Sequence, residues 1–179
     1  MGNVVQSTGG TQLAEGVVPQ QYLTFLLGGE MFAVAILNVK EIIEFGSMTT
    51  IPMMPSFIRG VINLRGAVVP VIDLSCRFGN DPSKVARRTC IVIIELQEGD
   101  QKHDIGVMVD AVSEVLEISP AEIEPPPAFG ARIRADFING MGKINGKFVI
   151  ILNVGKVLST EEISMLTQIS EGAQAEHAV

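Results

Sequence analysis

An internal duplication is the feature that most constrains how this chain can fold. Residues 57–74, FIRGVINLRGAVVPVIDL, align without a gap to residues 137–154, FINGMGKINGKFVIILNV, at an offset of 80 residues. The two segments share a phenylalanine, an isoleucine, two glycines and a valine: Phe57/Phe137, Ile58/Ile138, Gly60/Gly140, Gly66/Gly146 and Val69/Val149. Matched glycines at fixed spacing are harder to explain by composition than matched valines. We therefore interpret the two segments as copies of one structural unit.

A second pair of segments extends the duplication toward the N-terminus. Residues 32–44 align to residues 105–117 at an offset of 73, with the matches Val34/Val107, Val39/Val112, Glu41/Glu114 and Glu44/Glu117. Each copy then contains a hairpin, a strand, an irregular link and a second hairpin, which makes about five short strands. Because a sheet of this size removes its free edges by closing, the sequence predicts an all-β protein of two small barrels.

Turn and proline signals set the expected boundaries of the strands. Gly28–Gly29 and Arg65–Gly66 are two-residue hairpin signals, and a charged loop is expected over residues 97–104. The segment SFIRG, residues 56–60, is expected to form a single helical turn. Pro70 lacks an N–H group, so its strand is expected at a sheet edge or at a bulge.

The C-terminal segment LSTEEISMLTQIS has a different pattern. Ser159 and Glu162 have the spacing of a capping box, and Ile163, Leu166 and Ile169 share one face, so an amphipathic helix is expected. We expect residues 20–170 to form a single domain of two barrel subdomains, between flexible tails at residues 1–19 and 171–179.

Composition argues against nucleic acid and membranes as direct partners. The chain has 179 residues, of which 47% are hydrophobic and 18% charged, so it can bury a sizeable core. A net charge of -7 with few clustered basic residues is atypical of nucleic-acid binders. No stretch approaches the roughly 20 apolar residues of a membrane span, and no basic leader is evident. We expect a cytoplasmic protein without direct membrane insertion.

The reactive side chains are few and scattered. Cys76 and Cys90 form no metal-ligand spacing and are expected to be reduced and partly buried. His103 and His177 lie in polar segments without a plausible catalytic neighbour, and Gly60 and Gly66 belong to no phosphate-binding motif. We expect no catalytic residue, no metal site and no cofactor, and hence a protein that is not an enzyme.

Several consecutive motifs carry a resemblance to a known family. They are FIRGVINLRGAVVPVIDL, preceded by ILNVKEIIEF and IPMMPSF, and followed by GVMVDAVSEVL and ISPAEIEPPPAF. From about Gln21 to Leu166 the chain resembles the CheW family of chemotaxis coupling proteins. The resemblance implies two intertwined SH3-like five-stranded β-barrels, in agreement with the duplication, followed by the C-terminal amphipathic helix.

The resemblance also implies a function and partners. Members of the family are adaptors without catalytic activity. They bind the regulatory domain of a CheA-type histidine kinase, the cytoplasmic tip of methyl-accepting chemoreceptors and, in arrays, other CheW-like domains. The expected location is the cytoplasm, with recruitment to membrane-associated receptor arrays.

Three other interpretations stay open at this point. The same module ends CheA kinases and begins CheV-type adaptors, but the chain offers no room for their other domains, so we expect a stand-alone coupling protein. A coupling protein of a non-flagellar system, for example one controlling pili, would have the same sequence features. A small-ligand-binding β-barrel would need convergent polar groups around a pocket, and the sequence shows none at identifiable spacing.

Candidate receptor-binding residues follow from the duplication and the resemblance together. Arg65 and Asn63 differ from their counterparts Asn145 and Lys143, and positions where duplicated barrels differ are candidates for function. By resemblance, this arginine contacts the receptor, and a groove between the barrels has two walls, Ile36, Val39 and Glu41 on one and Val107 and Val109 on the other. The full predicted set is Ile36, Val39, Glu41, Gly60, Asn63, Leu64, Arg65, Gly66, Val107 and Val109. Kinase-binding residues are not assigned by the sequence.

Overall fold

The computed structural model describes residues 18–126, 135–159 and 161–169. The strands are β1 (Gln20–Leu27), β2 (Glu30–Ala35), β3 (Val39–Glu44), β4 (Ile58–Leu64), β5 (Ala67–Asp73), β6 (Cys90–Glu98), β7 (Gln101–Val109), β8 (Ala111–Ile118), β9 (Ile123–Glu124), β10 (Ile138–Ile144) and β11 (Lys147–Leu152). Short helical segments are η1 (Ile36–Asn38), α2 (Leu74–Arg77), η2 (Pro120–Glu122), η3 (Ala135–Phe137) and α3 (Val154–Val157), and residues 161–169 form the C-terminal helix. Residues 1–17 and 171–179 of the predicted tails, and residues 127–134, 160 and 170 of the predicted domain, lie outside the described residues.

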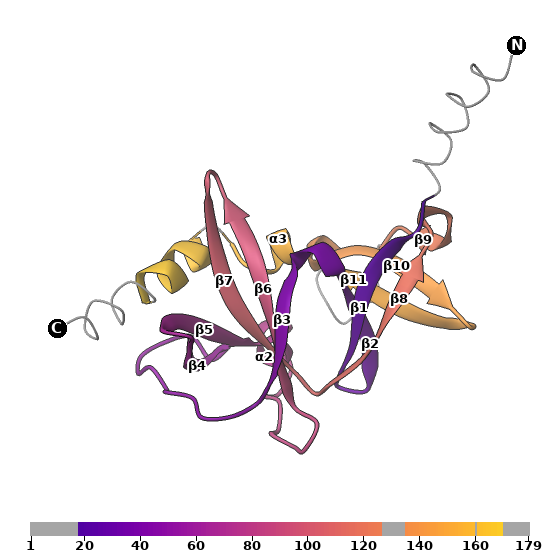
Figure 1. The fold of residues 1–179 in the computed structure, drawn as a ribbon. Helices are drawn as coiled ribbons and strands as arrows, with labels where there is room; N and C mark the ends of the chain where they lie inside the picture. Colours follow the sequence, from indigo (N-terminus) through magenta and orange to yellow (C-terminus); the bar gives the residue numbers. More distant parts are fainter. Residues whose placement is uncertain (1–17, 127–134, 160, 170–179) are drawn as a thin grey trace, which may run out of the picture.

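The strands form two sheets, and each sheet curls into a small SH3-like barrel (Figure 1). Barrel A has the strand order β8-β1-β2-β11-β10-β9, in which β9 contributes only two residues, and barrel B has the order β3-β6-β7-β5-β4. Neighbouring strands are antiparallel except for one parallel pair in each barrel, β2 with β11 and β5 with β7. The all-β fold with two barrels is therefore confirmed.

The two barrels correspond strand for strand. The offsets of 73 and 80 residues place β8, β2, β11 and β10 of barrel A onto β3, β7, β5 and β4 of barrel B. β1 holds the place of β6, so the spatial order of the five strands is the same. The parallel pairs correspond residue by residue, because Val71 lies opposite Gly106 in barrel B and Ile151 lies opposite Ala33 in barrel A. The duplication read from the sequence is thus also a duplication of structure.

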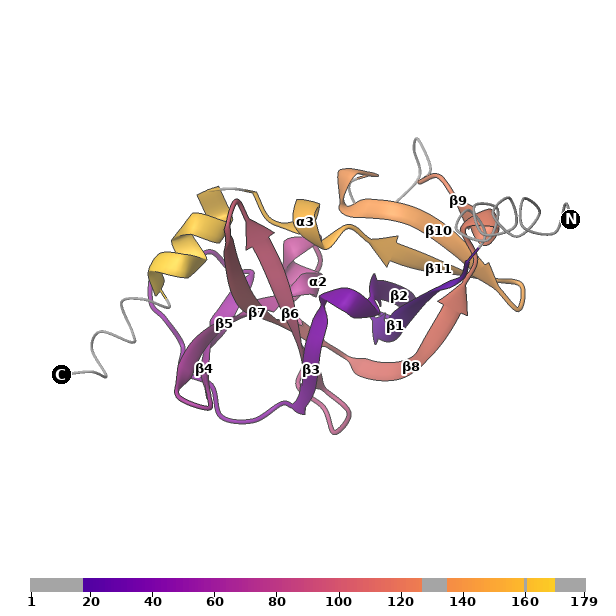
Figure 2. The same ribbon diagram turned by 45° about the horizontal axis from the view of Figure 1, so that its top comes forward.

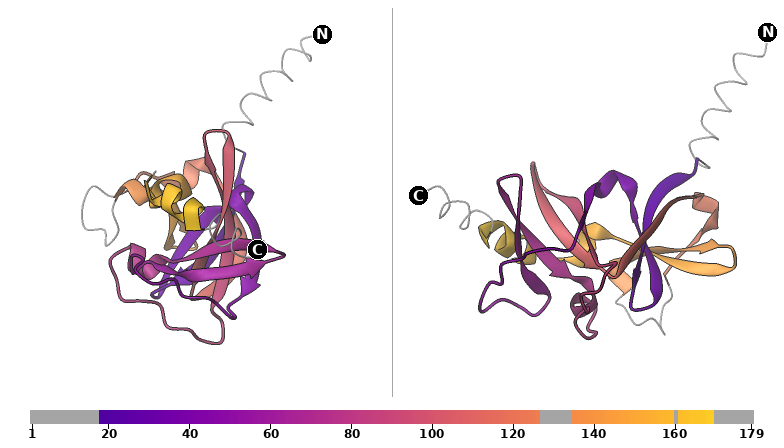
Figure 3. Two further views of the ribbon diagram at one scale, coloured as in Figure 1. Left: turned by 90° about the vertical axis from the view of Figure 1, so that its left-hand side faces the viewer. Right: turned by 60° about the horizontal axis from the view of Figure 1, so that its bottom comes forward.

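Each barrel contains segments from both copies, so the barrels are intertwined. The chain leaves barrel A after β2, turns through η1 and enters barrel B at β3, and it returns through Asp110 to β8 in barrel A. Figure 3 shows the two barrels side by side with these crossings between them. The duplication alone suggested that each copy forms one barrel, and this is wrong. The short turn at η1 directs β3, the third strand of the first copy, into the other sheet.

Two local expectations are also wrong. Residues 58–60 of the expected helical turn belong to β4, where Ile58 lies opposite Ile72 of β5. The expected loop over residues 97–104 is a two-residue turn at Gly99 and Asp100, since β6 and β7 stay paired as far as Glu98 and Gln101. The pairing of β4 with β5 in the first place, and of β6 with β7 in the second, overrides the preference of the local sequence for a turn or loop.

The strand of Pro70 lies inside a sheet and not on its edge, but the pairing of β4 with β5 has a bulge next to the proline, between Ile58 and Gly60. β5 is flanked by β7 and β4, but its pairing with β7 begins at Val71. On the other side, Val61 lies opposite Pro70 and exchanges its backbone hydrogen bonds with Thr49, at 2.8 and 2.9 Å. No ladder bond is lost at the proline, which explains why it is tolerated there.

A buried carboxylate holds the connection after β5. Asp73 is fully buried and caps α2 by accepting hydrogen bonds from the backbone N–H groups of Ser75 (3.0 Å) and Cys76 (3.5 Å). It also accepts from the Ser83 backbone at 2.9 Å and forms an ion pair with Arg59 at 3.3 Å. These bonds compensate the cost of burying the charge. Both cysteines are free and half-buried, as expected.

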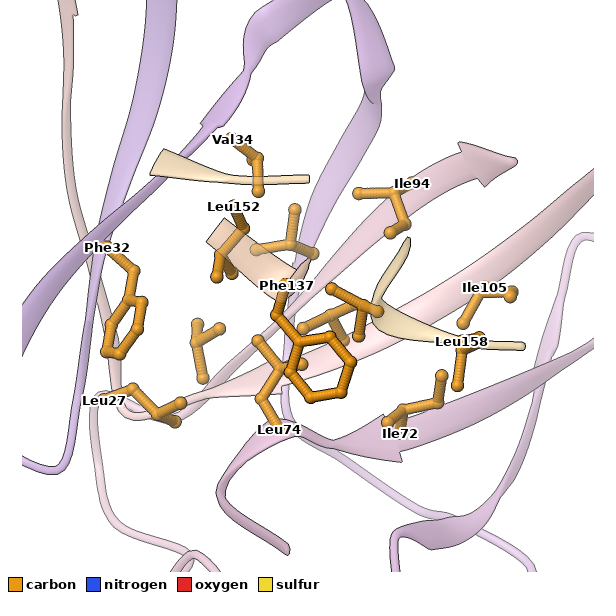
Figure 4. Close-up of a cluster of buried hydrophobic side chains, with 14 of the residues drawn as sticks. Leu27, Phe32, Val34, Ile72, Leu74, Ile94, Ile105, Phe137, Leu152 and Leu158 are labelled. Carbon is orange, nitrogen blue, oxygen red and sulfur yellow. The ribbon is translucent and has the colours of Figure 1, made fainter. Parts of the chain in front are cut away.

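A continuous apolar core fills the space between the barrels (Figure 4). Phe32, Val34 and Leu152 of barrel A meet Ile72 and Ile105 of barrel B in this core. A row of aromatic rings, Phe25, Phe32, Phe78 and Phe137, runs through it with centroid distances of 6.0, 5.7 and 5.9 Å. Each barrel also has a smaller apolar cluster of its own. Because the cluster between the barrels is shared, neither barrel can lose its packing there without affecting the other.

The C-terminal helix packs on barrel B beside β5 and β7 (Figure 2). The predicted capping box is present: Ser159 N donates to Glu162 Oε1 at 2.7 Å, and Glu162 N donates to Ser159 Oγ at 3.1 Å. Ile163 and Leu166 are buried, and Ile169 is half-buried against the core. Across the described part of the chain, no helix is both long and apolar enough to cross a membrane.

Candidate functional site

An exposed ion pair joins Arg65, at the tip of the β4–β5 hairpin, to Glu41 on the edge strand β3. Arg65 Nη1 donates to Glu41 Oε1 at 3.2 Å, and Nη2 donates to Oε2, so the contact uses both carboxylate oxygens. The Arg65 side chain is 72% exposed and that of Glu41 27% exposed. The paired geometry fixes the planar guanidinium at the surface, with part of its donor capacity still open to a partner.

The Arg65 turn has an unusual backbone. Arg65 has φ +51° and Gly66 has φ +87°, so both central residues of the hairpin turn lie in the left-handed region. The Asn63 side chain accepts a hydrogen bond from the backbone N–H of Gly66 at 2.9 Å and closes the turn. In the second copy the same φ of +51° is taken by Asn145, a residue type that tolerates it far better than arginine.

Charges alternate along the surface next to this turn. The hydrogen bond from Arg65 lowers the pKa of Glu41 below its ordinary value, which outweighs the opposing effect of partial desolvation. Lys40 binds Asp104 at 3.0 Å, and this hydrogen bond raises the pKa of the Lys40 ammonium. Both shifts favour the charged forms of Glu41 and Lys40, so β3 presents an ordered polar rim.

The predicted site residues separate into an exposed and a buried group. Asn63, Arg65 and Gly66 are exposed, and the half-buried residues are Ile36, Val39, Glu41 and Leu64. Gly60 is buried, as are Val107 and Val109, which are 7% and 0% exposed.

The two valines do not form the wall of an open groove. They belong to the core between the barrels, where the cavity beside Val107 has a volume of only about 20 Å³. The resemblance placed these two valines on the wall of a groove, but residues 105–109 of β7 are all buried, so neither face of the strand is open there.

Gly60 is required at its position by the close packing of the backbone. Its φ is +157°, and a Cβ atom there would lie 2.4 Å from the carbonyl oxygen of Thr49. The glycine thus allows the segment before β4 to cross close over the strand. Its contribution to the site is to shape the hairpin that carries Arg65.

One exposed apolar residue of this region was missed by the sequence reasoning. Leu37 lies in η1, immediately before β3, and is 94% exposed. Leu37 could have been found in the sequence, because a large aliphatic residue in a connection of only three residues has no core position to fill. Leu37 therefore places an exposed apolar side chain directly before the strand that carries Glu41.

Comparison with known proteins agrees with this architecture. The CheW-like domain matches residues 21–162. Chemotaxis protein CheW of Klebsiella aerogenes is 32% identical over 161 residues, which cover 90% of this chain and 95% of that protein. Chemotaxis protein CheW of Rhizobium meliloti is 32% identical over 143 residues, covering 80% of this chain and 90% of that protein.

A solved structure shows the same fold. The scaffolding protein TtCheW from Thermoanaerobacter tengcongensis superposes with a TM-score of 0.72 at 35% sequence identity, covering 81% of this chain and 91% of that one. The domain match, the relatives and the shared fold all extend over most of the chain, and both barrels are included. The chain belongs to the CheW family of chemotaxis coupling proteins.

Proposed function

We propose that the chain is a non-enzymatic adaptor that links the cytoplasmic tips of methyl-accepting chemoreceptors to the regulatory domain of a CheA-type histidine kinase. In this role it works in the cytoplasm, within membrane-associated receptor arrays, and allows the receptors to control kinase autophosphorylation. We assign the receptor contact to the surface formed by the Arg65 turn and β3. The observation that carries this assignment is an arginine in a left-handed conformation at a turn where the twin barrel has asparagine.

The backbone cost of this arginine is the first argument. A non-glycine residue in the left-handed region is disfavoured by roughly 1 kcal/mol, and asparagine is among the residue types that reduce this cost. The turn itself needs only what Asn145 and Gly146 supply in barrel A. Arginine at position 65 is therefore better explained by what its side chain does at the surface than by the fold.

The surroundings of Arg65 are the second argument. Receptor tips are helical hairpins, and a helix is bound by apolar anchors framed by polar groups. Here Ile36 and Val39 are half-buried, Leu37 is exposed, and Glu41 holds the guanidinium at the same edge strand. Val107 and Val109 support this surface from the core and make no direct contact in the proposal.

The decisive experiment is an assay of kinase autophosphorylation with receptor-bearing membranes, with and without this protein. Wild-type protein should raise the rate, and Arg65→Glu should abolish the increase, because the variant places two carboxylates together and removes the cation. Binding to receptor membranes should weaken by about tenfold or more. Exposed ion pairs contribute at most about 1 kcal/mol, so folding and binding to the kinase domain should persist.

Two control variants make the result specific. Arg87→Glu makes the same charge change at an exposed loop residue and should behave like wild type. Arg65→Asn reproduces the turn of barrel A, so it should fold normally and still lose receptor binding. If folded Arg65→Glu protein supports the kinase as well as wild type, the assignment of Arg65 is wrong; if wild type itself fails to bind the kinase domain, the adaptor proposal is wrong.

A further inference from the structure

The C-terminal helix forms one wall of a groove in barrel B, which we call groove B and which has an open volume of about 480 Å³ with the helix in place. The groove lies where β5 and β7 separate, between residues 67–70 and residues 101–105. Ile163 and Leu166, one helical turn apart, line it together with Val68 and Pro70 and are 8% and 2% exposed. Groove B is thus a site built to receive two aliphatic side chains of one helix.

Barrel A contains the twin of this groove, which we call groove A. An offset of 80 places Ala67, Val68 and Pro70 onto Lys147, Phe148 and Ile150, and an offset of 73 places residues 102–104 onto residues 29–31. All of these counterparts line one cavity of about 630 Å³, where β11 and β2 separate. The duplication has therefore reproduced the groove in barrel A.

Groove A lacks the helix that its twin has. In the described part of the chain the C-terminal helix lies on barrel B, at the opposite end of the molecule from the β10–β11 hairpin (Figures 1 and 2). The consequence appears at one pair of counterparts: Val68 is 6% exposed beneath the helix, whereas Phe148 is 52% exposed. Met31 and Met141, which also line groove A, have side chains that adapt to different apolar partners.

The charged residues of groove A also indicate a binding site for a partner. Glu114 and Asn145 line it, and they are the counterparts of Glu41 and Arg65. In barrel B the glutamate is bound by the arginine, but in barrel A asparagine stands in the place of that arginine. No ion pair of Glu114 is found among residues 18–126, 135–159 and 161–169. Lys147 also lines groove A, but among the described residues no arginine is paired with Glu114 as Arg65 is with Glu41.

We propose that groove A is a docking site for an amphipathic helix of a partner protein, which inserts two aliphatic side chains one turn apart and brings an arginine to Glu114. The aliphatic pair corresponds to Ile163 and Leu166 in groove B, and the arginine corresponds to Arg65. This surface is separate from the Arg65 turn, so the inference does not depend on the receptor contact proposed above.

The test uses the full chain, isotope-labelled, and a synthetic peptide with the sequence of residues 158–169 carrying Glu161→Arg and Gln168→Arg. NMR titration should shift the signals of Met31, Met141 and Phe148 in a saturable manner. Phe148→Ser should weaken binding by about tenfold or more, because it removes the largest exposed apolar side chain of the groove. Val115→Ser is the matched control: Val115 is apolar, 47% exposed and outside the groove, so binding should be unchanged.

Two further variants separate the parts of the proposal. A peptide that also carries Ile163→Ser and Leu166→Ser should not bind, because it lacks the aliphatic pair. Glu114→Gln should weaken binding of the arginine peptide and leave binding of the unsubstituted peptide unchanged.

Several results would overturn the inference. They are the absence of shifts in groove A at millimolar peptide, binding that Phe148→Ser does not weaken, and shifts confined to groove B, where the peptide would merely replace the chain's own helix. Self-association of the free chain that disappears in Phe148→Ser, measured by sedimentation, would assign groove A to a second copy of this chain and likewise contradict a partner helix.

Discussion

At the scale of single residues, two adjacent positions decide the shape of the β4–β5 turn. Both Arg65 and Gly66 have positive φ, and the second copy repeats this with Asn145 at +51° and Gly146 at +80°. The glycine is common to both copies because the turn requires it, whereas position 65 differs because its side chain is free to serve the surface. In the proposed assignment, the backbone requirement at Gly66 and the receptor contact at Arg65 are thus separated at neighbouring residues.

Gly66→Val should destabilise the protein by about 2 kcal/mol, because a β-branched residue is strained at positive φ. Gly66→Asn should cost less than about 1 kcal/mol, since asparagine tolerates this region, and there is open space around the Cβ position in either case. Thermal or urea unfolding measures both values. Equal stability of the valine variant and wild type would contradict the turn geometry.

At the scale of elements, each copy places a glycine where another segment crosses its strand. A Cβ atom at Gly60 would lie 2.4 Å from Thr49 O, and one at Gly140 would lie 2.5 Å from a methyl carbon of Ile123. The sequence showed the two glycines as a matched pair but did not show what they approach. The crossing segments precede β4 and β10 in corresponding places, so the close approach belongs to the barrel and not to one binding surface.

Gly60→Ala should therefore be more destabilising than Gly140→Ala. At Gly60 the obstacle is a backbone carbonyl that cannot move alone, and φ is unfavourable for alanine, so we expect about 2–3 kcal/mol. At Gly140 the nearest atom is a methyl carbon on the β-branched side chain of Ile123, the Glu124 carbonyl oxygen is farther away at 3.1 Å, and no unfavourable φ is added, so we expect about 1–2 kcal/mol. Equilibrium unfolding of the two variants checks the order, and the reverse order would contradict the assigned crossing.

The elements also show how far the sequence could be read. Turns such as Gly28–Gly29 and Arg65–Gly66 were predictable because their backbone needs are met by the turn residues themselves. The strand at residues 58–60 was not predictable from the local sequence, because it depends on pairing with β5. The burial of Val107 and Val109 was not predictable, because an aliphatic residue in the sequence has the same appearance in a groove as in a core between two barrels. The groove in barrel A becomes visible only when the position of the C-terminal helix is known.

At the scale of the whole molecule, one arginine joins the two copies. The Arg77 guanidinium lies between the rings of Phe57 and Phe137, at 5.2 and 5.1 Å from their centroids, and these rings are counterparts at an offset of 80. Arg77 Nε donates to the carbonyl of Val157 at 2.8 Å, and Val157 is the counterpart of Arg77 itself. A residue can contact its own counterpart only close to the axis that relates the two copies. Arg77 therefore lies near this axis.

Arg77→Met should loosen this axis while keeping most of the side-chain volume. It removes two cation–π contacts, the bond to Val157 and the ion pair with Glu162 at 3.0 Å, so we expect a loss of about 2–4 kcal/mol. Glu162→Gln is the matched control, because it removes only the charge of the partner and keeps an acceptor for the capping box; it should cost about 1 kcal/mol or less.

Urea unfolding should remain a single transition for both variants, since the aromatic core between the barrels is shared. A loss of similar size in the two variants would show that the ion pair alone matters, and two separate transitions in wild type would show that the barrels are held independently; either result would refute the role of Arg77 as the link between the copies.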